Sequence, residues 1–259
     1  MGKLNLGEIY GTHTLVVTAH RGFSGRFPEN TLLAFREAVN IGADIIEFDL
    51  RGTKDIIPIV IHDPTLDRTS DGEGLVGNYL LSEIKKFNFS FWQGAHNTGR
   101  KLSSPAYDDI RIPTFQEVID AMKGKTCMNI QLYDTTQPLL EKICRLYKEY
   151  DLYEDAYLTV GTYWEAEEIL RIDKKSSICI LNRQGNMTKD TLNDLKSFGC
   201  KYIQPFRADV TSEFCRKVKE LSLCANMFFS DTEDDNKKFI STGIQGILSN
   251  YPDILLNKE

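Results

Sequence analysis

The sequence predicts a single α/β domain with the architecture of a TIM barrel, in which eight parallel strands alternate with helices. The chain has 259 residues, of which 41% are hydrophobic, so it can bury one large core. Barrels of this type commonly reach ~250 residues. Short apolar runs rich in β-branched residues alternate along the chain with longer segments of helical periodicity. We therefore expect one domain over residues 1–259.

The barrel strands are expected where the short apolar runs occur, at residues 15–19, 44–49, 126–132, 156–160, 176–181, 201–204, 224–229 and 246–249. Helices are expected between them, at residues 31–41, 114–122, 137–150, 163–172, 189–198, 212–221 and 234–242. In the first helix Leu32, Phe35 and Val39 form an apolar stripe, behind Asn30 or Thr31 as the cap.

One long interval interrupts the alternation, because residues 51–113 separate the second strand from its helix. Loops in barrels are usually far shorter, so we expect an insertion here. It contains a strand-like run at residues 58–61, turn-forming residues at 70–77 and several aromatic residues near its middle. Insertions at the carboxyl ends of barrel strands lie over the active site. The interval is therefore expected to form a small lid subdomain.

Charge and composition exclude several classes of partner. A formal net charge of -6 and a pI near 5.4 argue against a general nucleic-acid or anionic-membrane binder. No run approaches the ~20 apolar residues that span a bilayer, and residues 1–13 lack the apolar core of a secretory signal. We expect a cytoplasmic protein, with a removed leader as the alternative. The oligomeric state is not predicted.

The six cysteines show neither a CxxC pair nor a metal-ligand spacing. Several lie inside apolar runs, where free cysteine packs as a small hydrophobic residue. We expect reduced, buried thiols at all of these positions: Cys127, Cys144, Cys179, Cys200, Cys215 and Cys224.

Two acidic residues alternate near the end of the second strand, where residues 45–50 read IIEFDL. Alternate residues of a strand face the same side, so Glu47 and Asp49 point together while Phe48 points away. Two adjacent carboxylates repel unless a cation or a basic group lies between them. Oxygen ligands of this kind suit Mg²⁺ or Ca²⁺. The pair predicts a metal site or, as the alternative, a solvent-facing or ion-paired strand end.

Two histidines stand at the ends of predicted strands. His20 ends the first strand and is followed by Arg21, and His62 closes the strand-like run at residues 58–61. The carboxyl ends of barrel strands are where these enzymes carry catalytic groups. Taken alone, a histidine in either position is more often a hydrogen-bonded structural residue than a catalyst.

Together with the acidic pair, these residues supply what cleavage of a phosphodiester needs. A metal polarises the phosphoryl oxygens, Arg21 neutralises the developing charge, and one histidine withdraws a proton while the other protonates the leaving alcohol. His13 and His96 lack such neighbours in the sequence, and we expect them to be surface or local structural residues.

The stretches around these residues resemble the glycerophosphodiester phosphodiesterase family. They are AHRG at residues 19–22, PENT at 28–31, GADIIEFDL at 42–50 and HDPTLDRTSDGEG at 62–74, in the family's order and spacing. The resemblance continues through IPTFQEV at 112–118 and ends at GILSNYPD at 246–253, so it covers nearly the whole chain. It implies a TIM barrel with an insertion in the second βα unit. It also implies hydrolysis of glycerophosphodiesters to glycerol 3-phosphate and an alcohol with Ca²⁺ or Mg²⁺.

Carried over by position, the resemblance implies a role for each of the residues in these stretches. His20 and His62 are the acid/base pair, and which is the acid stays open. Glu47 and Asp49 are metal ligands. Arg21 contacts the phosphate, and Asn30 holds the first loop.

The chain departs from the family pattern on the substrate-facing side. Gln131 stands where the family has Glu, so a neutral amide oxygen replaces a charged ligand and metal affinity should fall. Tyr133 stands where the family has a Lys that faces the phosphate, and it offers only a hydroxyl donor or a ring face. Near the end of the chain further family residues are replaced, by Asn226, Met227, Phe228, Ser249 and Asn250.

Three functions remain open at this point. The first is an active, metal-dependent phosphodiesterase acting on a small phosphodiester, with a modified substrate range. Gln131 and Tyr133 favour the second, a barrel that binds a phosphodiester with little turnover. The third is phospholipase D-like or lyase chemistry, in which an internal hydroxyl attacks phosphorus and leaves a cyclic phosphate.

Overall fold

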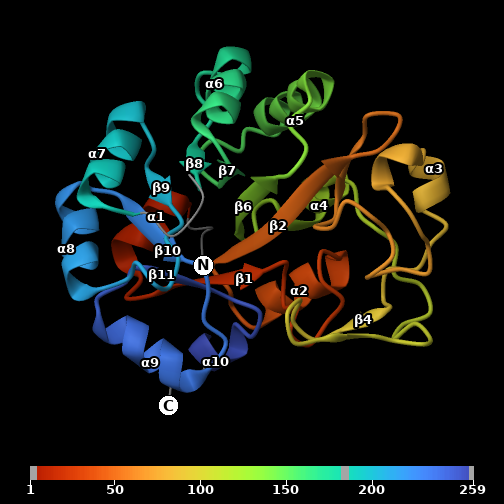
Figure 1. Ribbon diagram of the computed structural model, residues 1–259, viewed down its shortest axis with the longest axis horizontal. Helices are drawn as coiled ribbons and strands as arrows, with labels where there is room; N and C mark the ends of the chain where they lie inside the picture. The colour runs from red at the N-terminus through yellow and green to blue at the C-terminus, as the bar shows by residue number, and fades with distance from the viewer. Residues whose placement is uncertain (1–4, 182–186, 257–259) are drawn as a thin grey trace.

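The computed structural model describes residues 5–181 and 187–256, and it has the architecture of a TIM barrel (Figure 1). In the described residues, eight parallel strands form one sheet in the order β8, β7, β6, β2, β1, β11, β10, β9. The end strands β8 and β9 lie beside each other and nearly close the barrel. The strand bounds are β1 (Val16–His20), β2 (Ile45–Gly52), β6 (Cys127–Leu132), β7 (Ala156–Val160), β8 (Ile178–Ile180), β9 (Tyr202–Ile203), β10 (Cys224–Met227) and β11 (Gly246–Ser249).

Helices surround the barrel, and each predicted helix and strand overlaps an observed one (Figure 1). The helices are α2 (Leu32–Asn40), α4 (Phe115–Met122), α5 (Gln137–Glu149), α6 (Tyr163–Ile172), α7 (Lys189–Phe198), α8 (Ser212–Glu220), α9 (Glu233–Ser241) and the short α10 (Asp253–Leu256). Most of them begin behind a threonine whose hydroxyl accepts a hydrogen bond from a backbone N–H of the first turn. These caps are Thr31, Thr114, Thr162, Thr188, Thr211 and Thr232.

A short helix that the sequence did not predict, α1 (Leu6–Thr12), packs at one end of the barrel. It buries Leu6 and Ile9 in a cluster with inward-facing residues of the strands, among them Ile45 and Tyr157. Its seven residues are too few for a helical period to stand out in the sequence. The amino-terminal end of the barrel is therefore filled with apolar side chains, and polar groups are left to the other end.

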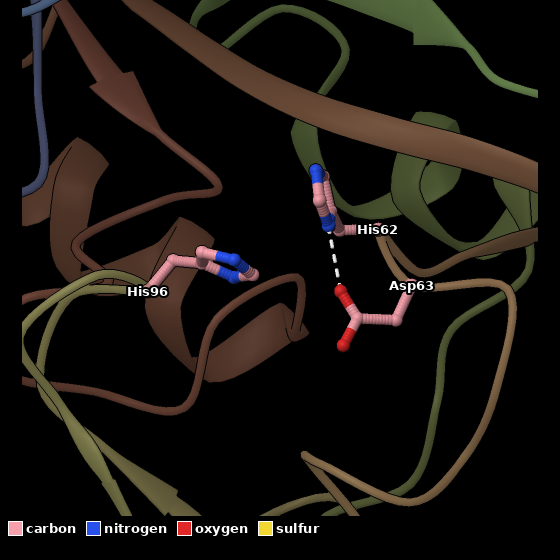
Figure 2. Close-up of side chains that lie close together, drawn as sticks. All are labelled: His62, Asp63 and His96. Atoms are coloured by element: carbon pink, nitrogen blue, oxygen red, sulfur yellow. Dashed lines mark hydrogen bonds and ion pairs between the residues drawn. The ribbon is translucent and has the colours of Figure 1, made fainter.

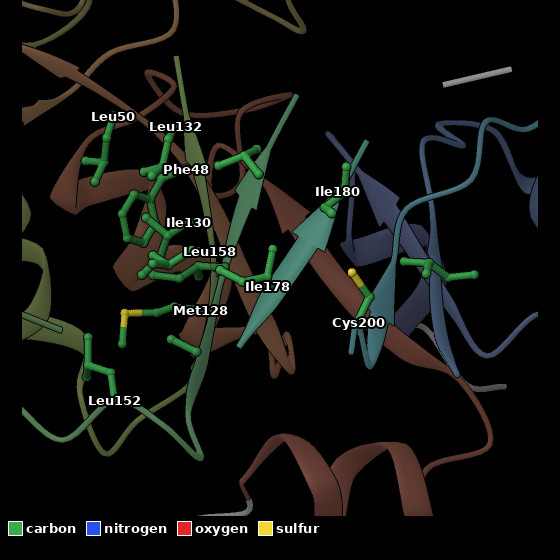
Figure 3. Close-up of a cluster of buried hydrophobic side chains, with 14 of the residues drawn as sticks. Phe48, Leu50, Met128, Ile130, Leu132, Leu152, Leu158, Ile178, Ile180 and Cys200 are labelled. Atoms are coloured by element: carbon green, nitrogen blue, oxygen red, sulfur yellow. The ribbon is translucent and has the colours of Figure 1, made fainter. Parts of the chain in front are cut away.

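The main core lies between the outer face of the strands and the helices. Figure 3 shows the part of it that is formed by side chains of β2, β6, β7 and β8. Phe48, Ile130, Leu158 and Ile178 stand side by side in register across these strands. Because side chains alternate along a strand, burying this row outward turns its sequence neighbours into the barrel. Glu47, next to Phe48, thus faces the interior.

Residues 51–113 lie beyond the carboxyl end of β2 (Figure 1). Their elements are β3 (Pro58–Val60), η1 (Val76–Asn78), α3 (Leu81–Ile84), β4 (Trp92–Gln93) and β5 (Arg100–Lys101), of which β3 pairs with β2 in antiparallel fashion. They form a hydrophobic cluster of their own, with Ile59, Ile61, Leu66, Val76, Ile84, Phe89 and Ile112. This separate cluster supports our proposal that the interval is a small subdomain within a single domain of residues 1–259.

Two further expectations concern the cysteines and membrane-spanning segments. The six cysteines are all free and buried, as predicted. Among the described helices, none has both the length and the apolar character required to cross a lipid bilayer.

Candidate active site

The predicted site residues meet at the carboxyl ends of the first barrel strands. The parallel register sets His20 beside Glu47 on neighbouring strands. It likewise sets Asp49 beside Gln131. His62 follows β3, which pairs with β2, and so reaches the same end of the barrel. The pairing of strands distant in the sequence therefore gathers these residues in one place.

A cavity opens at this end, which we call the barrel-mouth cavity. It has a volume of about 490 Å³. It is lined by His20, Arg21, His62, Gln131, Leu132, Tyr133, Gly161, Glu165, Leu181, Gln204, Phe206 and Phe228. Of the residues that the sequence singled out, Phe228 also contributes to its wall, where the family pattern has a different side chain.

Glu47 and Asp49 are both buried, and the relative exposure of each residue is 1%. Oε2 of Glu47 accepts a hydrogen bond of 3.0 Å from the backbone N–H of Arg21. Its Oε1 is buried and has no hydrogen-bond partner among the described residues. Burial, and then the charge of Asp49, raise the pKa of Glu47 well above its ordinary value. A hard cation would satisfy this oxygen and offset the repulsion, so the carboxylates fit a divalent metal.

Asn30 and Arg21 hold the second carboxylate in place. Nδ2 of Asn30 donates to Oδ2 of Asp49 at 2.8 Å, and Nε of Arg21 lies 3.3 Å from the same oxygen. Both Arg21 and Asn30 have a positive φ, 57° and 58°, and the backbone N–H of Asn30 donates to the carbonyl of Arg21. This local bend turns the N–H of Arg21 toward Glu47. From these contacts we propose that Asn30 holds the first loop in place.

His20 is buried and its tautomer follows from its neighbours. Nδ2 of Asn250 donates to Asp231 at 2.7 Å, which turns Oδ1 of Asn250 toward Nδ1 of His20 at 2.8 Å. Nδ1 must therefore carry the proton. Burial, and then the charge of Arg21, lower the pKa of His20 to about 3. His20 is thus a neutral imidazole whose Nε2 carries a lone pair, 3.8 Å from Oε2 of Glu47.

His62 has a different environment. Its Nδ1 lies 2.7 Å from Oδ1 of Asp63, and Arg68 donates to both oxygens of Asp63. Although burial opposes it, these hydrogen bonds hold the pKa of Asp63 well below its usual range. The ionised carboxylate of Asp63 accepts from Nδ1 of His62 and so fixes the orientation of the imidazole ring.

Arg68 and Arg21 are joined by the buried carboxylate of Glu29. Glu29 accepts from Nη1 and Nη2 of Arg68 at 2.7 Å, and from Nη1 of Arg21 at 2.9 Å. Burial alone would raise the pKa of Glu29, but the two guanidinium groups outweigh it and hold the pKa at about 2. A chain of ion pairs therefore runs from Asp63, beside His62, through Arg68, Glu29 and Arg21 to Asp49.

Tyr133 and Gln131 both line the barrel-mouth cavity. The ring centroid of Tyr133 lies 5.0 Å from that of His62, and the guanidinium carbon of Arg51 lies 4.9 Å from the Tyr133 centroid. Burial, and then the charges of Asp49 and Glu47, raise the pKa of Tyr133, so its hydroxyl stays protonated. Tyr133 can therefore offer a hydrogen-bond donor to the cavity.

The interpretation of His96 as a surface or local structural residue is wrong. Its Nδ1 lies 3.2 Å from Nη1 of Arg21, and its ring lies 5.0 Å from that of His62. Figure 2 shows the ring reaching from the insertion toward His62 and Asp63. The contact spans 75 residues of sequence, so local pattern gave no sign of it. His13, by contrast, is an exposed residue that pairs with Asp44.

Among the described residues, His62, Asp63 and His96 place ligand atoms within 4.8 Å of one another, close enough to hold one metal ion. Arg68 already donates to both oxygens of Asp63, however. A cation here would have to displace a guanidinium group and would be repelled by it. The deeper carboxylates of Glu47 and Asp49 are the better candidates.

Sequence reasoning assigned no role to Glu29, Asp63, Arg68, Asp231 and Asn250. The first three lie inside the stretches PENT and HDPTLDRTSDGEG, so the resemblance to the family could have pointed to them. Asn250 was noted only as a departure from the family pattern. Asp231 lies in a loop without any motif.

Comparison with known proteins identifies the family of this chain. The model of the glycerophosphoryl diester phosphodiesterase family matches residues 20–254. A glycerophosphodiester phosphodiesterase of Caldanaerobacter subterraneus is 30% identical over 94% of this chain and 97% of its own length. A crystal structure of a glycerophosphodiester phosphodiesterase from Agrobacterium tumefaciens superposes with a TM-score of 0.79 and 21% identity, covering 94% of this chain and 100% of that one.

A phosphodiesterase of Oleispira antarctica, solved with the product sn-glycerol-3-phosphate, superposes with a TM-score of 0.74. It is 23% identical and covers 92% of this chain and 93% of its own. The structural matches show the TIM-barrel fold, and the family match extends over most of the chain. This chain therefore belongs to the glycerophosphoryl diester phosphodiesterase family and is a phosphoric diester hydrolase.

Proposed function

We propose that the protein hydrolyses glycerophosphodiesters to glycerol 3-phosphate and an alcohol, with a divalent cation as cofactor. The observation that carries the proposal is the buried carboxylate pair of Glu47 and Asp49, which faces a neutral His20 and the guanidinium of Arg21. Such a pair binds a cation and, with it, an anionic diester. The family membership supports the same substrate class.

Glu47, Asp49 and Gln131 would hold the cation, which is Ca²⁺ or Mg²⁺ by the oxygen donors that they offer. When bound, the cation polarises the phosphoryl oxygens. Because Gln131 is neutral, the protein contributes two negative charges, and binding should be weak. The unpartnered Oε1 of Glu47 supports this assignment.

Arg21 would contact the phosphate and neutralise charge in the transition state. Its guanidinium cannot swing away, because Glu29 and Asp49 hold it on two sides. Burial opposes the charged form, but these carboxylates more than compensate and raise the pKa of Arg21. The hydroxyl of Tyr133 would supply one further donor at the cavity wall.

His20 and His62 would divide the acid and base roles. Nε2 of His20 carries a lone pair, so it withdraws a proton from the attacking water. His62, whose Nδ1 is held by Asp63, donates a proton from Nε2 to the leaving alcohol oxygen. His20 is held neutral with a free lone pair, whereas Nδ1 of His62 is hydrogen-bonded to the carboxylate of Asp63. This difference supports His20 as the base and His62 as the acid.

Two other outcomes use the same residues. An internal hydroxyl of the glycerol arm could replace water as the nucleophile and leave a cyclic phosphate. Gln131 favours the alternative of binding with little turnover, because it weakens the metal site.

An assay of the purified protein on several glycerophosphodiesters, with Ca²⁺, Mg²⁺ or EDTA, tests the proposal. We expect cation-dependent release of glycerol 3-phosphate. Tight binding of the diester without any product would support the binding barrel and contradict the proposed reaction.

A further inference from the structure

We propose that His96 determines specificity at this site, by donating a hydrogen bond from Nε2 to a hydroxyl of the substrate's glycerol arm. This rests on the proposed function, since it names where one arm of the diester lies. His96 would be a binding residue supplied by the insertion rather than by the barrel.

The first observation is a second cavity, which we call the insertion pocket. It has a volume of about 260 Å³. It is lined by His20, Arg21, His62, Ala95, His96, Asn97, Thr98, Phe228, Phe229, Asp231 and Asn250. It shares His20, Arg21, His62 and Phe228 with the barrel-mouth cavity.

The shared wall fits the shape of a phosphodiester. A phosphodiester carries two alcohol arms on one phosphorus, and catalysis requires that phosphorus beside the shared residues His20, Arg21 and His62. With the phosphorus there, one arm extends into each cavity. The insertion pocket is thus the subsite for one of the two arms.

The size of the two cavities and the groups of the turn decide which arm we assign to the insertion pocket. At about 260 Å³ it is smaller than the barrel-mouth cavity of about 490 Å³, which has polar wall residues of its own such as Gln131 and Gln204. Glycerol is the arm common to all glycerophosphodiesters, whereas the other alcohol varies in size. The smaller pocket, in which His96, Asn97 and Thr98 offer hydrogen-bonding groups to hydroxyls, therefore suits the constant glycerol arm.

The proton of His96 is fixed by Arg21. A guanidinium group has only donors, so Nδ1 of His96, 3.2 Å from Nη1 of Arg21, must accept. The ring then carries its proton on Nε2 and is neutral. Burial, followed by the charges of Arg68 and Arg21, lowers the pKa of His96 and favours the same form. A neutral ring with one N–H presents a donor to an uncharged hydroxyl.

Backbone hydrogen bonds close the turn that carries His96. The turn joins β4 to β5, and Ala95 at its base is buried and accepts from the backbone N–H of Thr98 and Gly99. A Cβ on Gly99 would lie 2.5 Å from the carbonyl oxygen of Gln93, so the turn requires glycine there. His96 is therefore presented from a fixed hairpin.

Two substitutions distinguish the acceptor role of Nδ1 of His96 from the donor role of its Nε2. In His96→Asn the amide oxygen replaces Nδ1 and still accepts from Arg21, but nothing occupies the position of Nε2. In His96→Gln the longer side chain returns an N–H donor near that position. His13→Asn is the control, because His13 pairs with Asp44 and lines neither cavity.

Calorimetric titration with glycerol 3-phosphate and with propyl phosphate, which lacks the hydroxyls, measures the contact. We expect His96→Asn to weaken binding of glycerol 3-phosphate by roughly three- to tenfold and to leave propyl phosphate unchanged. His96→Gln should recover most of the loss. The KM for glycerophosphocholine should follow the same order, with little change in kcat.

The inference is overturned if His96→Asn binds glycerol 3-phosphate as the wild type does, if it loses both ligands equally, or if His96→Gln fails to recover binding. Binding does not require turnover. A wild-type protein that binds these ligands but releases no product would therefore contradict the proposed reaction and still decide the role of His96.

Discussion

Nδ1 of His20 donates to Oδ1 of Asn250, 2.8 Å away, and Asp231 fixes the orientation of that amide. The two residues are 230 positions apart and are brought together because β1 pairs with β11. The bond places the lone pair of His20 on Nε2, toward Glu47. The tautomer of the proposed base is therefore set by the last strand of the barrel.

Asn250→Ala should lower kcat by roughly 10- to 100-fold with a small change in KM. The reason is that His20 loses the partner that fixes its tautomer, while the metal ligands and Arg21 are unchanged. Steady-state kinetics on glycerophosphocholine provides the measurement. Asn40→Ala, at an exposed asparagine of α2, is the control. Equal kinetics of the two variants would contradict the claim that Asn250 fixes the tautomer of His20.

His20→Ala and His62→Ala should each lower kcat by ~10² to 10⁴ while the protein stays folded. Each removes one side of the proton transfer. Kinetics together with circular dichroism checks this prediction. His13→Ala should keep wild-type activity, and a loss there as large as at His20 would show that the assignment is wrong.

Glu29→Gln should destabilise the protein by an amount that depends on pH. The folded-state pKa of about 2 lies below the ordinary value of 4.5, so the ionised carboxylate stabilises the native state. This stabilisation is present above pH 4.5 and is lost as the pH falls toward 2. We expect the free energy of unfolding to fall by roughly 3 kcal/mol at neutral pH.

Urea unfolding of both proteins across this pH range tests the prediction. The difference between wild type and variant should shrink as the solution is acidified. Glu167→Gln, on the exposed face of α6, should show no such trend. A difference that stays constant from neutral to acidic pH would mean that Glu29 acts by packing rather than by charge.

Gln131→Glu should tighten binding of Ca²⁺ and Mg²⁺ by roughly tenfold, if the added charge contributes about 1.4 kcal/mol after desolvation. Calorimetric titration of both proteins gives the two affinities. Gln116→Glu, on the exposed part of α4, adds the same charge away from the site and should change nothing. Weaker or equal binding by the Gln131 variant would mean that this residue does not face the ion.

The sequence predicted the parts of this molecule that repeat over short distances. Alternating apolar runs located the strands and helices, and the two-residue period of β2 predicted that Glu47 and Asp49 share a face. The stretches AHRG and HDPTLDRTSDGEG located His20 and His62. These signals depend only on neighbours along the chain.

What it did not predict are contacts between distant segments. His96 reaches Arg21 across 75 residues, and Asn250 reaches His20 across 230. Their positions depend on how the insertion folds back and on which strands pair. Helix α1 was missed for another reason, since its seven residues are too few to show a helical period.

Phosphorus NMR of glycerophosphocholine incubated with the protein tests the central claim most directly, because it identifies the product as well as its rate of formation. With Ca²⁺ or Mg²⁺ present, we predict that the diester signal is replaced by that of glycerol 3-phosphate. EDTA or the His20→Ala substitution should stop the conversion. A diester signal that persists in the presence of either cation, or the accumulation of a cyclic glycerol phosphate, would contradict the account of hydrolysis at a metal-assisted histidine pair.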